Sequence, residues 1–197
     1  MPIMLGTKAK KIPFKKAYLG NVLKYEKITE EAFDSSIIPI SWTQITEGIK
    51  YKSTNEYGEW IITANSYYNS LSSYPVNQAF DNNNDTSWSS EQLTSSSIKA
   101  EIIIECPVKI KPLQIYVNTE NAGTSDEPGV FQGYNETNSS WETLCSANLS
   151  GVNVDINIDK FFSKFRVYSG RTASGTRYNR VIINELKIIK GYFKKGG

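Results

Sequence analysis

From residue 57 onward, short segments in which apolar and polar residues alternate follow one another, with turn-forming residues between them. Val152, Val154, Ile156 and Ile158 alternate strictly with polar residues, which is the period of a half-buried strand. Similar apolar segments occupy residues 59–64, 98–105, 107–118, 129–134, 141–145, 164–169 and 181–190. Because no apolar stripe of helical period and useful length competes with them, the pattern predicts an all-β protein, folded as an antiparallel sandwich or barrel.

The composition excludes several classes of chemistry. The chain has 197 residues, of which 12% are aromatic and none is histidine. The lack of histidine excludes Ser-His-Asp and Cys-His catalysis and His-ligated zinc. A formal net charge of +2 argues against a protein dedicated to nucleic acid. Cys106 and Cys145 are interpreted as buried thiols, and a disulfide between them stays open because geometry decides it.

The first part of the chain differs from the rest. Residues 1–27 contain seven lysines and a single acid, and Gly20-Asn21 lies between two apolar arms. This predicts a two-residue β-hairpin, which is marginal alone and is expected to dock on another protein. We assign residues 28–56 to a connector with a helical turn near 28–33, and 193–197 to a tail. No secretory signal or apolar run of membrane-spanning length is visible, so synthesis in the cytoplasm without membrane insertion is expected.

Between two of these strands lies a polar corner. Six consecutive oxygen-bearing side chains run from Asp81 to Thr86, with Phe80 before them and Trp88 two residues after them. Asn and Asp favour turns and bond their own backbone. A tight turn rich in oxygen donors and held by two aromatics suits a calcium ion. A plain polar loop is the alternative that composition leaves open.

These residues, together with segments elsewhere, carry a resemblance to a known family. The ordered motifs are Ala79-Phe80-Asp81, Thr86-Ser87-Trp88, Phe165-Arg166-Val167-Tyr168 and Ile183-Asn184-Glu185-Leu186. In this order they resemble the discoidin-like domain, also called the coagulation factor V/VIII type C domain, over roughly residues 57–192. The resemblance implies a jelly-roll β-sandwich of the galactose-binding-like kind, here with an N-terminal hairpin extension.

The resemblance also implies a structural calcium ion where the corner meets the last strand. Its ligands would be Ala79 through its backbone carbonyl, the side chains of Asp81, Asn83 and Thr86, and Glu185 from the end of the domain. A sodium ion, or hydrogen bonds without a metal, is the alternative.

Two further expectations follow from the same resemblance. Asn82 stands where the family usually has glycine, so a positive φ is expected there. Trp88 and Trp141 are predicted to be core anchors.

Members of this family bind ligands and rarely catalyse, and no carboxylate pair here follows a glycosidase pattern, so we expect no enzyme. Sugar binding needs aromatic faces and planar polar groups. The loops at one end supply them in Tyr67, Tyr68, Tyr74, Arg171, Arg177, Tyr178 and Asn179. The alternative is that these side chains only solvate the loops. Because the loops lack apolar tips, lipid binding is not favoured.

The hairpin carries a second resemblance. The segment from Lys16 to Tyr25 resembles segments that open many bacteriophage tail and baseplate proteins. It favours a virion structural protein of the tail, baseplate or capsid fibre, with residues 1–27 attached to other virion proteins in a multimer and the sandwich adhering to a host-surface glycan. The alternatives are a decoration protein whose sandwich contacts only proteins, and a non-catalytic module of a bacterial glycosidase system.

Overall fold

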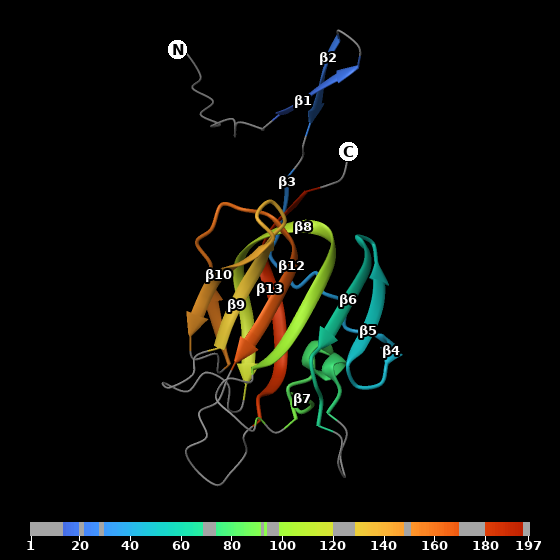
Figure 1. Ribbon diagram of the computed structural model, residues 1–197, viewed down its shortest axis with the longest axis vertical. Helices are drawn as coiled ribbons and strands as arrows, with labels where there is room; N and C mark the ends of the chain where they lie inside the picture. Colours follow the sequence, from blue (N-terminus) through green and yellow to red (C-terminus); the bar gives the residue numbers. More distant parts are fainter. Residues whose placement is uncertain are drawn as a thin grey trace, which may run out of the picture.

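The computed structural model describes residues 14–19, 22–27, 30–68, 74–91, 93, 99–119, 129–147, 151–169 and 180–194. Within this part of the chain, β1 (Phe14–Leu19) and β2 (Val22–Lys27) pair antiparallel, with Leu19 opposite Val22. The two strands of the predicted hairpin are therefore confirmed. Figure 1 shows this pair separate from the main body of the protein.

The main body is built almost entirely of strands. A short 3-10 helix, η1 (Val76–Phe80), interrupts them, and no helix among the described residues is long and apolar enough to span a bilayer. The strands of this part of the chain form one connected sheet of eleven. They are β3 (Glu30–Phe33), β4 (Thr43–Thr46), β5 (Lys50–Asn55), β6 (Gly58–Ala64), β7 (Trp88–Ser89), β8 (Ala100–Thr119), β9 (Gly129–Asn135), β10 (Ser140–Ala147), β11 (Val152–Asp155), β12 (Phe162–Ser169) and β13 (Ile182–Lys194).

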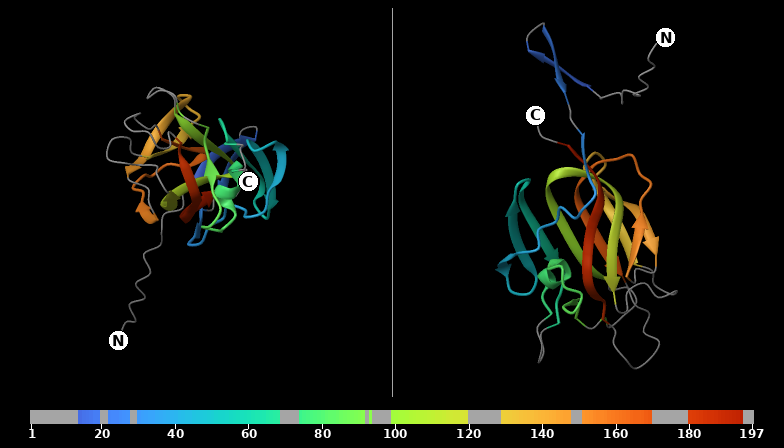
Figure 2. Two further views of the ribbon diagram at one scale, coloured as in Figure 1. Left: turned by 90° about the horizontal axis from the view of Figure 1, so that it is seen from below. Right: turned by 180° about the vertical axis from the view of Figure 1, so that it is seen from behind.

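One long strand turns this connected sheet into a sandwich. The first part of β8, through Glu105, lies between β12 and β6. Its second part pairs with β13 on one side and with β11 on the other. Between the two parts β8 arches over one end of the molecule, so that β9, β10 and β12 lie in one layer and β13 lies behind them (Figures 1 and 2). The predicted all-β sandwich is confirmed.

A break in the alternation of β8 allows both of its parts to face the same core. Ile102 and Ile104 are buried in the first part, and Ile115 and Val117 are buried in the second. The first pair has even residue numbers and the second has odd ones, so strict alternation would place them on opposite faces of the strand. An irregularity that adds one residue, such as a β-bulge, must therefore lie between them. The pairing with β13 shifts register opposite Pro112, which has no backbone N–H to donate. The core between the layers is completed by Trp60, Phe80, Trp88, Phe131, Phe165 and Ile188.

The segment assigned to a connector is different in the structure. Residues 30–33, expected near a helical turn, form β3 and pair with the last four residues of β13. Strand β5 pairs with β6, and β4 pairs with β5. The edges of β13 and β6 offer unpaired backbone N–H and C=O groups. Pairing with these groups outweighs the local conformational preference of the segments that become β3 and β5. The predicted tail also starts later, since β13 continues to Lys194.

The prediction that two tryptophans anchor the core is right for one and wrong for the other. Trp88 is 1% exposed, whereas Trp141 is half-buried and lies outside the core. The Arg166 guanidinium lies 4.5 Å from the centroid of the Trp141 ring, and Tyr134 meets that ring edge-on. Alternation alone does not tell which face of β10 is inside.

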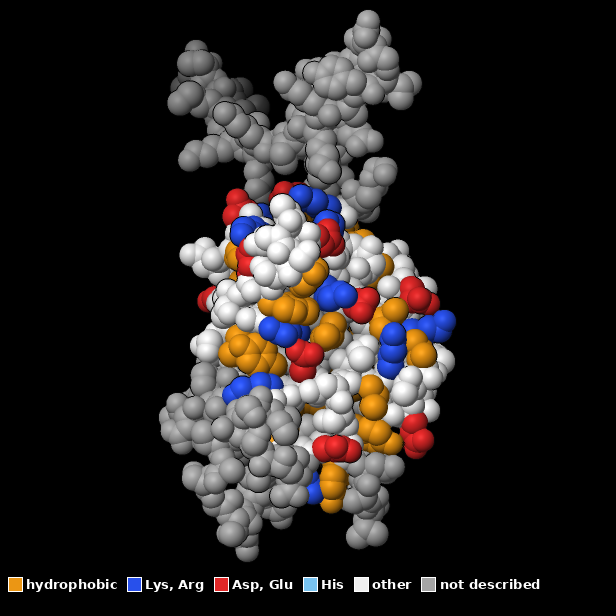
Figure 3. All heavy atoms as spheres, viewed as in Figure 1, with side chains coloured by type: hydrophobic (Ala, Val, Ile, Leu, Met, Phe, Trp, Pro, Cys, Tyr) orange, Lys and Arg blue, Asp and Glu red, His pale blue; other side chains and the backbone are white. Residues whose placement is uncertain are grey.

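Hydrophobic, basic and acidic side chains are interspersed on the face of the molecule seen in Figure 3.

Both cysteines are free and half-buried. Burial raises the pKa of the Cys145 thiol to about 11 and that of Cys106 well above its ordinary value. The two residues are therefore free thiols, as predicted, but each is half-buried instead of fully buried.

Core packing can be tested with two isoleucines of opposite exposure. Ile104→Ala removes a fully buried side chain from the middle of β8 and should lower the free energy of unfolding by about 2–5 kcal/mol. Ile40→Ala, at a site that is 58% exposed, should change it by no more than about 0.5 kcal/mol. Urea denaturation measures both, and equal losses would contradict the described core.

Candidate functional site

The two candidate sites are joined by β7, which lies at the end of the sandwich opposite the arch of β8 (Figure 1). Trp88 is buried and pairs with Ile183 of β13. Its indole Nε1 donates a hydrogen bond of 3.0 Å to the carbonyl of Ser66. The carbonyl of Ser89 accepts one of 2.7 Å from the backbone N–H of Tyr68. This two-residue strand therefore fixes two distant parts of the sequence, residues 66–68 and the start of β13.

The first site is a cluster of two tyrosines and an arginine. The rings of Tyr68 and Tyr74 are stacked, with centroids 6.2 Å apart and planes at 29°. The Arg180 guanidinium carbon lies 3.1 Å from the centroid of the Tyr68 ring. Arg180 Nε is buried and has no hydrogen-bond partner within the described part of the chain. A ring face can stack on the C–H face of a sugar. A guanidinium beside that ring can donate hydrogen bonds to the oxygens of the sugar.

The arginine is held at this cluster through Ser90, the residue that follows β7. The backbone N–H of Val181 donates to Ser90 Oγ (3.0 Å), and the carbonyl of Val181 accepts from the N–H of Ser90 (2.9 Å). Arg180 precedes Val181 directly, so these two bonds hold it beside the tyrosines. Sequence analysis did not single out Arg180, although its position just before the last apolar strand was a signal that it would be well anchored.

The predicted ligand-binding residues have different outcomes. Tyr68 and Tyr74 lie together, whereas Tyr67 packs against the turn at Gly48. A Cβ atom added to Gly48, whose φ is +65°, would lie 2.3 Å from the Tyr67 ring, so that ring is a packing element. The remaining predicted residues, Arg171, Arg177, Tyr178 and Asn179, lie outside the described residues.

The second site is the polar corner that follows η1. Asp81 Oδ2 accepts a hydrogen bond of 2.7 Å from the Thr86 hydroxyl, and Asp81 Oδ1 accepts one of 3.0 Å from the N–H of Asn83. Asn83 Oδ1 accepts in turn from the N–H of Asp85. Asn82 has a φ of 62°, as its position in the turn predicted. The corner is thus a turn closed by hydrogen bonds to its own carboxylate and amide oxygens.

Glu185 of β13 lies beside this corner. It is 1% exposed, and its Oε2 has no hydrogen-bond partner among the described residues. The nearest cation is Lys187, whose Nζ lies 3.7 Å from Oε2 and donates to Asn82 Oδ1 at 2.6 Å. Burial raises the pKa of Glu185 to about 7, Lys187 opposes this rise, and the charge of Asp81 adds to it. A cavity of about 200 Å³ borders Glu185, Asn82 and Lys187.

These donors fit a hard cation better than a transition metal. The negative charge of Asp81 contributes to the raised pKa of Glu185. Asn184 Nδ2 donates a hydrogen bond of 3.1 Å to the carbonyl of Asn84, which ties the corner to β13. Ala79 lies buried within η1, just before the corner. The described residues contain no cluster of three or more His, Cys, Asp or Glu. A cation here would depend on amide, hydroxyl and carbonyl oxygens beside two carboxylates, a set typical of calcium.

Comparisons with known proteins identify the fold. The family 32 carbohydrate-binding module of NanJ from Clostridium perfringens, solved with galactose, matches with a TM-score of 0.50 and 13% identity, over 73% of this chain and 99% of that one. The chain therefore has the discoidin-like, galactose-binding-like β-sandwich fold that its motifs predicted.

Other solved structures are similar to a lesser degree. A chitosan-binding module from a chitosanase/glucanase of Paenibacillus sp. IK-5 has a TM-score of 0.49 and 18% identity, over 67% of this chain and 92% of that one. A family 89 glycoside hydrolase from Clostridium perfringens has a TM-score of 0.49 and 15% identity, and the match spans 74% of this chain but 15% of the hydrolase. No protein-family model and no curated protein matches the sequence.

The buried carboxylate predicts how stability depends on pH in the presence of a chelator. The pKa of Glu185 is raised from 4.5 to about 7 in the folded protein, so the folded state holds its proton more tightly. The resulting stabilisation is complete below about pH 4.5 and is lost as the pH rises through about 7. The free energy of unfolding should fall by about 1–3 kcal/mol over this range.

Urea denaturation at several pH values measures this dependence. Glu185→Gln should remove the fall, whereas Glu91→Gln, at an exposed position, should retain it. A wild-type protein whose stability does not fall between pH 4.5 and 7 would contradict the described burial.

Proposed function

We propose that the sandwich is a non-catalytic domain that binds carbohydrate through Tyr68, Tyr74 and Arg180. The observation that carries this proposal is the stacked tyrosine pair with a guanidinium 3.1 Å from one ring and an unpaired Nε. The rings offer a flat apolar face, and the guanidinium offers donors in a fixed plane. Because Ser89 and Ser90 anchor the backbone at all three positions, little ordering entropy is lost on binding.

The fold supports the same class of ligand. The module of NanJ that shares this sandwich was solved with galactose. A galactose-type ring presents one apolar C–H face and several hydroxyls, which is the combination that the cluster can accommodate. We therefore take galactose as the first soluble probe, with a glycan array to find the preferred sugar.

We further propose that the protein is a bacteriophage virion component. The hairpin would attach it to other virion proteins, and the sandwich would adhere to a host-surface glycan. The lysine-rich composition of residues 1–27 and their resemblance to the openings of tail proteins support this assignment. The fold fits a carbohydrate-binding module of a glycosidase system equally well. Tail or capsid genes beside its gene would favour the virion, and glycosidase genes would favour the module.

We also propose that the corner binds a structural calcium ion. The supporting observation is the buried Glu185 oxygen without a hydrogen-bond partner beside a cavity and a turn rich in oxygens. Asp81, Asn83 and Thr86 would hold the ion from the corner through their oxygens, Ala79 through its carbonyl, and Glu185 from β13. Such an ion would cross-link the loop before β7 to the strand after it and so stabilise the sandwich.

Carbohydrate binding is tested by substitution at the cluster. Tyr74→Ala and Arg180→Met should each weaken galactose binding, measured by NMR titration, by about tenfold, or ~1.4 kcal/mol. Tyr168→Ala removes a half-buried tyrosine of β12 outside the cluster and should leave affinity unchanged. A folded protein that binds neither galactose nor any glycan on an array would overturn the proposal.

Calcium binding is tested by thermal unfolding. Added calcium should raise the melting temperature, by an amount equivalent to ~2.7 kcal/mol at a hundredfold excess over Kd, and Asp81→Asn should abolish most of the rise. Lys187→Met should enlarge the rise in melting temperature. The ammonium group 3.7 Å from Glu185, which repels the calcium ion, is then absent. Lys190→Met, an equal charge loss at an exposed site of the same strand, is the control. A melting temperature that neither chelator nor calcium changes would refute the site.

A further inference from the structure

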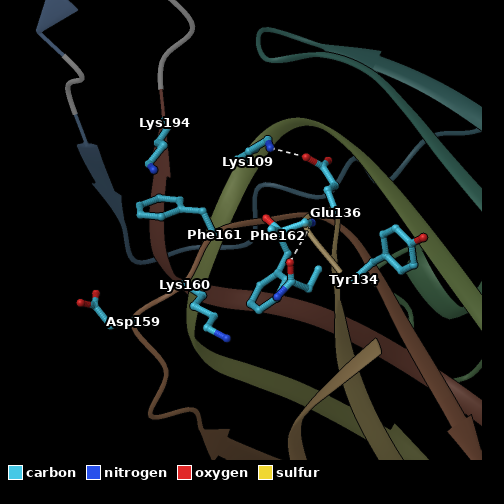
Figure 4. Close-up of a pocket in the computed structure, with 10 residues that line it drawn as sticks. Lys109, Tyr134, Glu136, Asp159, Lys160, Phe161, Phe162 and Lys194 are labelled. Atoms are coloured by element: carbon cyan, nitrogen blue, oxygen red, sulfur yellow. Dashed lines mark hydrogen bonds and ion pairs between the residues drawn. The ribbon is translucent and has the colours of Figure 1, made fainter. Parts of the chain in front are cut away.

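A larger cavity, of about 380 Å³, lies at the other end of the sandwich. It is formed by the end of β9, the turn that follows it, the start of β12 and the end of β13 (Figure 4). Figure 1 shows this end beside the arch of β8 and far from β7. None of the residues predicted to bind ligand or metal lines it. Its volume lies within the range of small-molecule sites, which is roughly 300–1,000 Å³.

The walls of this cavity are held in place by close contacts. Phe162 lies on Gly133, where an added Cβ atom would come within 2.5 Å of its ring. Glu136 is paired with Lys109 and accepts a hydrogen bond of 2.5 Å from the hydroxyl of Ser163. These contacts join β8, β9 and β12, so the cavity is preformed.

A second ion pair fixes the opposite wall. Lys160 Nζ lies 2.7 and 2.8 Å from the two carboxylate oxygens of Glu142. The side-chain amide of Asn135 donates to the same carboxylate at 2.5 Å. Lys109 and Lys160 are thus both neutralised by neighbouring carboxylates.

The third lysine of the cavity is different. Lys194 Nζ lies 4.2 Å from the centroid of the Phe161 ring, and Figure 4 shows the two side chains next to each other. In the described part of the chain, no carboxylate lies within ion-pair distance of Lys194. On the same ring, Lys111 Nζ lies 5.3 Å from the centroid, but Lys111 is paired with Asp159 at 3.0 Å. The cavity therefore combines an aromatic ring with one ammonium group that has no direct ion-pair partner in the described part of the chain.

We propose that this cavity is a second ligand site, for a carboxylate-bearing sugar such as a uronic acid. The aromatic rings would contact the apolar face of the sugar, and Lys194 would bind its carboxylate. An anion is favoured over a neutral sugar because Lys109 and Lys160 are each held by a glutamate, whereas Lys194 has no carboxylate within ion-pair distance in the described part of the chain. The site does not depend on the function proposed for the Tyr68 cluster, and its position allows both to be occupied together.

The experiment is an NMR titration of the ¹⁵N-labelled full chain with D-galacturonic acid and, separately, with D-galactose. The two sugars differ only in a carboxylate that replaces a hydroxymethyl group. Galacturonic acid should shift the amide signals of Asn135, Thr137 and Phe161, and galactose should shift them far less. Lys194→Met should raise the Kd for galacturonic acid about tenfold.

Two control variants separate binding in this cavity from a general effect of charge and from binding at the Tyr68 cluster. Lys190→Met, which removes the same charge from an exposed position of β13, should leave galacturonic acid binding unchanged. Tyr74→Ala should also leave it unchanged, so that failure of one site is distinguishable from failure of the other. Three results would overturn the proposal: no shift at the cavity amides, equal shifts with galactose, or equal weakening by Lys194→Met and Lys190→Met. Tighter binding of a hexaglutamate peptide would instead assign the cavity to acidic peptides.

Discussion

The burial of Trp88 is the interaction on which the loop end of this protein depends. A strand of two residues has too few backbone hydrogen bonds to hold its own position. The indole is 1% exposed and also donates to the Ser66 carbonyl, so the hydrophobic effect and one satisfied polar group fix β7 together. The bonds of Ser89 and Ser90 then hold the tyrosine cluster, and the polar corner leads directly into β7. Loss of that burial would affect both sites at once.

The sequence predicted the features that local physics determines. Alternation identified the strands, and the turn position of Asn82 predicted its positive φ. The predictions that failed concern pairing and direction, which depend on distant residues. The helical turn expected near residues 28–33 became β3 because the edge of β13 was open. Trp141 faces outward because alternation identifies two faces without saying which is inside. Arg180 is placed by two hydrogen bonds between its neighbour Val181 and Ser90, which is about ninety residues away in the sequence.

The polar corner contains a buried carboxylate, and burying a carboxylate costs free energy unless a cation or a hydrogen-bond donor pairs with it. Glu185 is buried, and its pKa is raised because desolvation outweighs the attraction of Lys187. At 3.7 Å the ammonium is too far to hydrogen-bond the carboxylate, and its close partner is Asn82 Oδ1. The lysine therefore compensates the charge without satisfying the oxygen. A divalent cation would do both, which is the physical reason for proposing calcium where hydrogen bonds alone already close the turn.

The two ends of the sandwich also differ in what makes their surfaces rigid. At the end that holds β7, hydrogen bonds to Ser89 and Ser90 position the segments that carry Tyr68, Tyr74 and Arg180. At the end with the arch of β8, ion pairs between lysines and glutamates hold the cavity walls, and Phe162 fills the space that Gly133 leaves. Ion pairs of this kind contribute little to folding stability at a surface. They do order the lysine and glutamate side chains before a ligand binds, so these side chains lose less conformational entropy on binding. Their presence around Phe161 and Lys194, and not merely the volume enclosed, is what distinguishes this cavity from an incidental gap between turns.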